Sequence, residues 1–259
     1  MLRPLIWMSM MFVTVMAVVL PAAYFYTAAT LPQLDTEFDL LRVLKQPIES
    51  ERRSMQMNHY DKTTDPVEFP QPDISNLPKE LVALYITERG CPGYFQSPRE
   101  EGWPWAKRML GVFAGMEFAG DGWCEKLMAE TIARRAGAKG SMEIIVAAHK
   151  IHRFLKKDGL VAYDLATENM EEGVIGVEAI SKILFHKKLS DLTLAELAEF
   201  QLATPPHGYY NEVKTCGNSQ LIRQNRDLLL DRLAGVGMVG TDKAEIAKQQ
   251  PVTCLSIKR

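Results

Sequence analysis

The chain has 259 residues, of which 47% are hydrophobic and 24% are charged. This composition supplies enough apolar side chains for one ordinary domain or two small ones, and it excludes a disordered protein. With 30 Lys and Arg against 32 Asp and Glu, the formal charge of −2 excludes a protein that coats nucleic acid through a generally basic surface. The mean hydropathy of −0.11 excludes a polytopic membrane protein.

The N-terminal segment departs from this average. No charged residue occurs from Pro4 to Leu34, and the run Leu5–Tyr26 is long enough to cross a hydrocarbon core of about 30 Å as a helix. Arg3 before the run favours an orientation with the N-terminus inside and the rest outside. The alternative is a cleaved signal peptide with Leu5–Leu20 as its apolar region. The length favours an uncleaved anchor, and both interpretations place the rest of the chain outside the cytoplasm.

We therefore expect three parts: an anchor over residues 1–34, a stalk over residues 35–66 and a folded domain over residues 67–259. The stalk is predicted from clustered charges and from the proline-rich run VEFPQPDISNLP, with a short helix around Phe38–Leu44.

Beyond Pro78 the apolar spacing is helical. Lys79–Arg89 places Leu81, Leu84, Tyr85 and Glu88 on one face and ends before Gly90. Ser141 is expected to cap the helix Met142–Lys157. The further predicted helices are Glu125–Arg135, Met142–Lys157, Val177–Leu184, Thr193–Leu202 and Leu221–Leu233. Because alternating strand patterns are scarce, the fold class is mainly α.

Glu88 is the strongest candidate for chemistry. It lies on an apolar helix face and near a helix C-terminus, where the helix dipole disfavours an anion. Such a carboxylate is either paired with a cation, for which Arg89 is adjacent, or kept as a general base with a raised pKa.

The second candidate region is the basic turn before the helix at residue 142. Arg134, Arg135 and Lys139 precede Glu143 there, in a pattern that can hold a phosphate at a helix N-terminus. Acidic residues in a first helical turn are also ordinarily stabilising, so Glu143 alone indicates no function. His149 and His152 have spacing for a shared metal, but no third ligand is evident, which favours a solvated polar flank.

The cysteines form no metal-ligand spacing, and in an oxidising compartment they permit two disulfides in any of three pairings. They are Cys91, Cys124, Cys216 and Cys254.

Three segments follow one another between Val67 and Lys248: DISNLPKELVALYITER, KGSMEIIVAAHKIHRFLKK and EEGVIGVEAISKILFHKKLSDLTLAELAEFQLATPPHGYYN. Their order resembles the glycosyltransferase family 51 domain, the peptidoglycan glycosyltransferase module of bifunctional penicillin-binding proteins and their monofunctional relatives. The first segment places Glu88 at the family's catalytic glutamate. The second is similar to the family's R-K-x-x-E helix and places Glu143 at its second glutamate, with Lys139 at the arginine. The resemblance implies a lysozyme-like, two-lobed helical fold.

Several positions depart from the family's pattern. Arg89 replaces the aspartate that follows the first glutamate, and Gly140 replaces the second basic residue of R-K-x-x-E. The family's G-G-S-T-I-T-Q-Q donor-site motif corresponds to GDGWCEK, which keeps one cation, Lys126. The family's Y-L-N signature survives only as YDL, with Asp164 at its centre.

The resemblance implies an enzyme that polymerises lipid II at the outer face of the bacterial cytoplasmic membrane, with inversion and loss of undecaprenyl pyrophosphate. Glu88 would take the proton from the acceptor hydroxyl, and Glu143 would hold Mg²⁺ or Mn²⁺ or the pyrophosphate. The basic side chains that would bind substrate are Lys139, Arg134, Arg135 and Lys126.

The altered donor motif supports a second interpretation, a degenerate module that binds a glycan, a lipid carrier or a protein partner in the envelope. A lysozyme-like glycan-cleaving enzyme is a third, which no residue positively favours. The most local of the three cysteine pairings is Cys91–Cys124 with Cys216–Cys254. The resemblance places Cys91 and Cys124 in segments that border the family's active site, and we therefore expect a disulfide between them.

Overall fold

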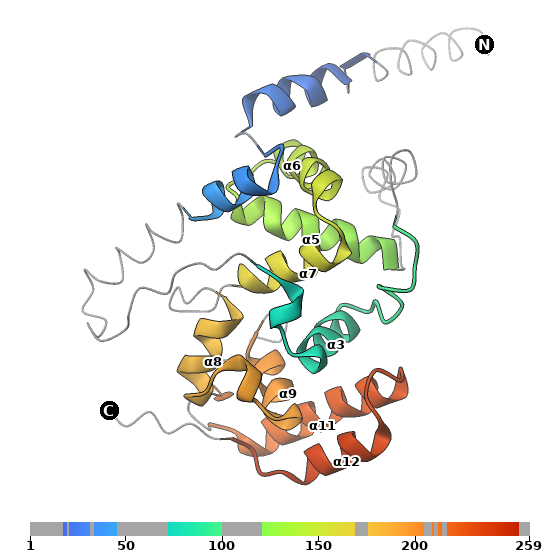
Figure 1. Cartoon of the computed structure of the whole chain (residues 1–259), viewed down its shortest axis with the longest axis vertical. Helices are drawn as coiled ribbons and strands as arrows, with labels where there is room; N and C mark the ends of the chain where they lie inside the picture. The colour runs from blue at the N-terminus through green and yellow to red at the C-terminus, as the bar shows by residue number, and fades with distance from the viewer. Residues whose placement is uncertain are drawn as a thin grey trace, which may run out of the picture.

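The computed structural model (Figure 1) describes residues 18–19, 21–31, 34–45, 72–99, 121–168, 176–204, 209, 212–213 and 217–253. Within these residues the protein is mainly helical and contains no strand, which confirms the expected mainly α class.

The elements follow in the order η1 Ile74–Asn76, α3 Lys79–Glu88, α5 Asp121–Arg135, α6 Ser141–Phe154, α7 Lys157–Ala166, α8 Val177–Phe185, η3 Leu189–Asp191, α9 Leu194–Ala203, α11 Ser219–Gly235 and α12 Thr241–Gln249. Residues 21–30 and 37–45 are also helical. Two predictions need correction. Gly140, not Ser141, is the N-cap of α6, and the helix predicted over Met142–Lys157 ends at Phe154, with α7 beginning at Lys157.

The helices form two groups (Figure 1). The first contains α5, α6 and α7, with both α6 and α7 packed on α5. The second contains α3, α9, α11 and α12, in which α3 packs on α9 and α11, and α12 packs on α11.

The helix α3 has a local signal at each end. Pro78 precedes its first residue, and Gly90 follows it with φ +73°, a left-handed conformation that glycine adopts without a steric penalty. The predicted apolar face is buried, with Leu81, Leu84 and Tyr85 each at most 2% exposed.

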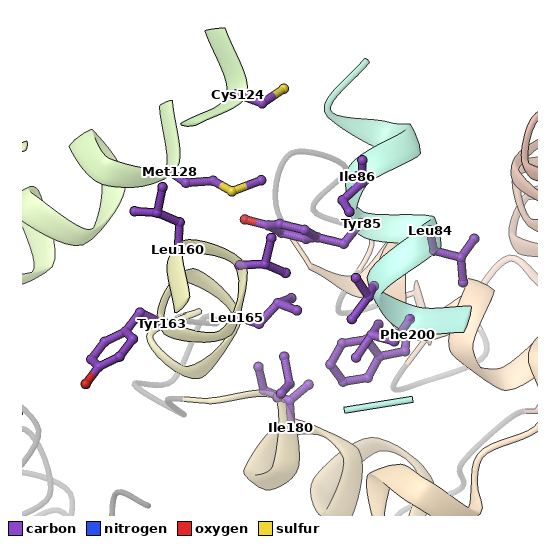
Figure 2. Packing of buried hydrophobic residues seen from close by; sticks show 14 of the residues in the cluster. Leu84, Tyr85, Ile86, Cys124, Met128, Leu160, Tyr163, Leu165, Ile180 and Phe200 are labelled. Atoms are coloured by element: carbon purple, nitrogen blue, oxygen red, sulfur yellow. The ribbon is translucent and has the colours of Figure 1, made fainter. Parts of the chain in front are cut away.

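The core lies where the two groups meet. Figure 2 shows Tyr85 of α3 pointing towards Met128 of α5 and Leu160 of α7, with Phe200 of α9 below. All four side chains are at most 2% exposed. Burying such residues contributes roughly 1.5–3 kcal/mol each, which ties the two groups together through α3.

A buried arginine ties the end of the described chain to the second group. Arg226 of α11 is 0% exposed and donates to Glu199 of α9 at 3.1 Å and to the carbonyl oxygens of Lys248 and Gln250 at 3.0 Å. The other oxygen of Glu199 accepts the backbone N–H of Thr253 at 3.0 Å.

The beginning of the predicted stalk is packed on the domain. Residues 37–45 form the expected short helix, but Leu40 is 0% and Leu44 2% exposed in the core, and the Tyr163 hydroxyl donates to Glu37 at 2.9 Å. This segment is therefore part of the folded domain, because its apolar face is buried there.

Most of the expected anchor Leu5–Tyr26 lies outside the described residues. Among the helices that are described, none combines the length and the apolar character needed to cross a membrane.

Candidate functional site

Glu88, the expected general base, is the last residue of α3. Its side chain is 4% exposed, and its Oε1 accepts a hydrogen bond from Nη1 of Arg232 at 2.9 Å. Arg232 lies on α11, and its side chain is 58% exposed. The expected burial on an apolar face is present, and the cation that pairs with Glu88 comes from a distant helix.

Arg89, which the sequence offered as a partner for Glu88, forms its ion pair with Asp164. Its Nη2 lies 2.9 Å from Oδ2 of Asp164, which is 0% exposed on α7. The Tyr85 hydroxyl donates to the same oxygen, and the Arg89 guanidinium lies 4.5 Å from the Tyr85 ring centre. Arg89 and Asp164 therefore compensate each other's charge in the core.

Glu168 extends this buried cluster. It is 6% exposed, and burial together with the nearby Asp164 charge raises its pKa from 4.5 to about 7. The positive charges of Arg89 and Arg135 act in the opposite direction. Burial also raises the pKa of Asp164, again against the effect of Arg89.

A disulfide joins Cys91, just after α3, to Cys124 in the first turns of α5. The Cα atoms are 6.4 Å apart, within the usual range for a disulfide. This is the expected Cys91–Cys124 bond. Cys216 and Cys254 lie outside the described residues, so the Cys216–Cys254 bond stays a prediction.

Residues 123–126, near the start of α5, make contacts within the protein. Oε2 of Glu125 lies 2.8 Å from Nε2 of His152, and Oε1 lies 3.2 Å from Nζ of Lys157. Lys126 is 3% exposed, pairs with Glu130 at 2.5 Å and lies over the ring of Trp123. None of these groups is presented to solvent as a substrate contact. His152, expected on a solvated flank, is instead buried.

Lys157 also fixes the loop after the disulfide. Its ammonium donates to the carbonyl oxygens of Tyr94 and Ser97 and to the Ser97 hydroxyl. Together with the disulfide, these bonds attach the segment 91–99 to α5 and α7.

Glu143 lies in the first turn of α6. Its Oε2 accepts the backbone N–H groups of Lys139 at 2.9 Å and Gly140 at 3.3 Å, and these bonds lower its pKa. In the segment that precedes α6, Lys139 and Arg134 are exposed and Arg135 is half-buried. The glutamate therefore acts as a helix cap.

The structure places the two glutamates in different helix groups. Glu88 ends α3, which packs on α9 and α11, whereas Glu143 begins α6, which packs on α5 (Figure 1). No set of three or more His, Cys, Asp or Glu residues in the described part of the chain is arranged to hold a metal ion. A surface hollow of about 290 Å³ between α9 and α12 is lined by neither glutamate.

Comparisons with protein-family models and with curated proteins give no match for this chain.

The sequence singled out Glu88 and Glu143 as candidates but did not reveal which residues bond to them. The buried Arg89–Asp164 pair joins residues 75 positions apart, and no local spacing reveals it. The available signal was only the opposite charge of the two side chains.

Proposed function

We propose that the chain is a membrane-anchored, glycosyltransferase-like module of the bacterial envelope that binds a lipid-linked or polymerised glycan without polymerising it. The two helix groups would be the two lobes of a lysozyme-like fold, with the domain on the extracytoplasmic side of the cytoplasmic membrane. The observation that carries the proposal is that both glutamates are engaged in internal bonds.

The first bond is the Glu88–Arg232 ion pair. A general base needs an oxygen within hydrogen-bond reach of the hydroxyl that it deprotonates. Oε1 of Glu88 is instead 2.9 Å from Arg232. Because the Glu88 side chain is also 4% exposed, an acceptor sugar would have to displace the arginine before reaching it.

The residues that would bind the donor's pyrophosphate also support a module that does not polymerise glycan. Catalysis of pyrophosphate departure needs cations and hydrogen-bond donors aimed at the developing charge. Cys124, Glu125 and Lys126 are each at most 3% exposed, and all three are bonded within the protein. Groups that serve the interior cannot also stabilise a leaving pyrophosphate.

An anionic ligand would bind at the turn between α5 and α6. Arg134 and Lys139 are exposed there, and neither forms an ion pair within the described part of the chain. Exposed cations of this kind suit the pyrophosphate of a lipid carrier.

The test measures binding and polymerisation of fluorescent lipid II by the full-length protein in detergent with Mg²⁺ or Mn²⁺. We expect binding that weakens in Arg134→Ala/Lys139→Ala, and no glycan polymer from the wild type. Arg223→Ala/Lys243→Ala, which removes two exposed cations on α11 and α12, is the matched control and should bind normally. Absence of binding by folded wild-type protein would refute the module.

The second candidate is an active peptidoglycan glycosyltransferase. It is favoured by the location of Glu88 on an apolar helix face and of Glu143 beside exposed cations. Glu88 would deprotonate the acceptor after Arg232 moved away, and Glu143 would hold the metal or the pyrophosphate. Glycan chains made by the wild type and by Glu80→Gln, but not by Glu88→Gln, would establish this enzyme and overturn the first proposal.

A further inference from the structure

The helix of residues 37–45 is fixed to the domain by one face. Leu40 and Leu44 are buried in the core, and Glu37 accepts the hydrogen bond from Tyr163 of α7. These contacts lie about one helical turn apart, so they define the orientation of the helix and leave its opposite face outward.

The outward face combines an aromatic ring with two cations. Phe38 is 74% exposed, the Arg42 side chain is 52% exposed, and Lys45 is exposed. Their spacing of four and three residues places all three along one side of the helix. A single exposed phenylalanine is ordinary on a protein surface, so this ring is informative only together with the two cations beside it.

The expected anchor leaves the domain at the same end of the molecule. The helix of residues 21–30 meets α6 there, because Lys150 donates to the carbonyl oxygen of Ala28 at 3.2 Å and pairs with Asp35 at 3.3 Å. The Tyr24 ring lies edge-on to His149 of α6. Phe25 and Tyr26 are at least 70% exposed.

Figure 1 shows the helices of residues 21–30 and 37–45 both at the α6 end of the molecule, opposite α12. A further exposed cation, Arg153, lies on α6 one turn after His149. Aromatic rings beside arginine and lysine are typical of a surface at the membrane interface, where the ring enters the headgroup region and the cations meet lipid phosphates.

We propose that Phe38, Arg42, Lys45 and Arg153 form a surface that rests on an anionic lipid bilayer, with the Phe38 ring in the interface. The proposal rests on the membrane location given under the proposed function. It adds that the domain is held against the bilayer by its own folded surface as well as by the anchor.

The experiment places benzoylphenylalanine, a photo-crosslinking residue, at single positions of the full-length protein. The protein is reconstituted in nanodiscs of equal parts phosphatidylglycerol and phosphatidylcholine, irradiated and analysed for lipid adducts by mass. We expect Phe38→benzoylphenylalanine to give several-fold more adduct than Ile246→benzoylphenylalanine, which labels a side chain of α12 that is 61% exposed. Adding Arg42→Glu and Lys45→Glu should lower the yield at position 38, and only with the anionic lipid.

A third position separates the two proposals. Phe25→benzoylphenylalanine labels the anchor helix itself. If position 25 gives adducts but position 38 gives no more than position 246, the proposed lipid-binding surface is refuted. The proposed membrane location would still stand. No adduct at position 25, with protein released from membranes by alkaline washing, would overturn both.

Discussion

Replacing Arg89 by methionine should destabilise the protein strongly, because it leaves the carboxylate of Asp164 in the core without its ion-pair partner. Asp164 is 0% exposed, and its Oδ1 has no hydrogen-bond partner in the part of the chain that is described. Breaking a buried ion pair by removing one partner costs about 3–5 kcal/mol. The Arg89 side chain is 17% exposed, so water screens part of the pair, and we expect a loss of about 3 kcal/mol.

The assay is urea denaturation of the full-length protein in detergent, followed by circular dichroism. The variant Arg89→Met/Asp164→Asn should recover most of the loss, because asparagine carries no charge and still accepts the hydrogen bond of the Tyr85 hydroxyl. Arg42→Met, which removes an exposed arginine from a surface pair with Asp39, should change the free energy of unfolding by less than about 1 kcal/mol.

The reasoning would be refuted if Arg89→Met alone were as stable as Arg42→Met, or if the double variant were no more stable than the single one. The second result would mean that Arg89 contributes through packing on the Tyr85 ring and not through its charge.

Two further predictions concern the same region. The pKa of Glu168 is about 7 in the folded protein against 4.5 for a free side chain, so the folded state keeps a proton that the unfolded state loses between these values. The free energy of unfolding should therefore rise as the pH falls from about 8 to about 5, by up to about 3 kcal/mol, and Glu168→Gln should flatten this dependence; a wild-type curve that is already flat would contradict it. Cys91→Ser/Cys124→Ser should lower the free energy of unfolding by about 3–4 kcal/mol, since the disulfide closes a loop of 33 residues. A reductant titration of the wild type checks this value independently, and equal stability of oxidised and reduced protein would argue against it.

Elements with strong local signals were predictable. The helix α9 begins after Thr193, whose hydroxyl accepts the N–H of Glu196 while the Glu196 carboxylate accepts the N–H of Thr193. This reciprocal cap is a capping box, and the sequence T-L-A-E predicts it. The apolar stripe of α6 was equally clear, and its members Ile144 and Ile151 are buried.

Elements that depend on distant contacts were not predictable. The sequence reads as one helix through Lys157, yet Leu155 adopts an extended conformation and separates α6 from α7. The break places the Lys157 ammonium among Tyr94, Ser97 and Glu125, and these contacts outweigh the local helix preference.

In the candidate site too, contacts between distant residues were not predictable. The apolar surroundings of Glu88 could be predicted from the spacing of residues within one helix. Its partner Arg232 lies 144 residues further along the chain, and only the packing of α3 on α11 brings the two together.

The buried Arg226 makes the backbone up to residue 253 part of the packed structure. A protein shortened before Thr253 would leave one oxygen of Glu199 without its backbone donor, and one shortened before Lys248 would also remove both carbonyl acceptors of the arginine. Tags and fusion partners at the C-terminus should therefore be attached beyond residue 253, where they leave this arginine's acceptors in place.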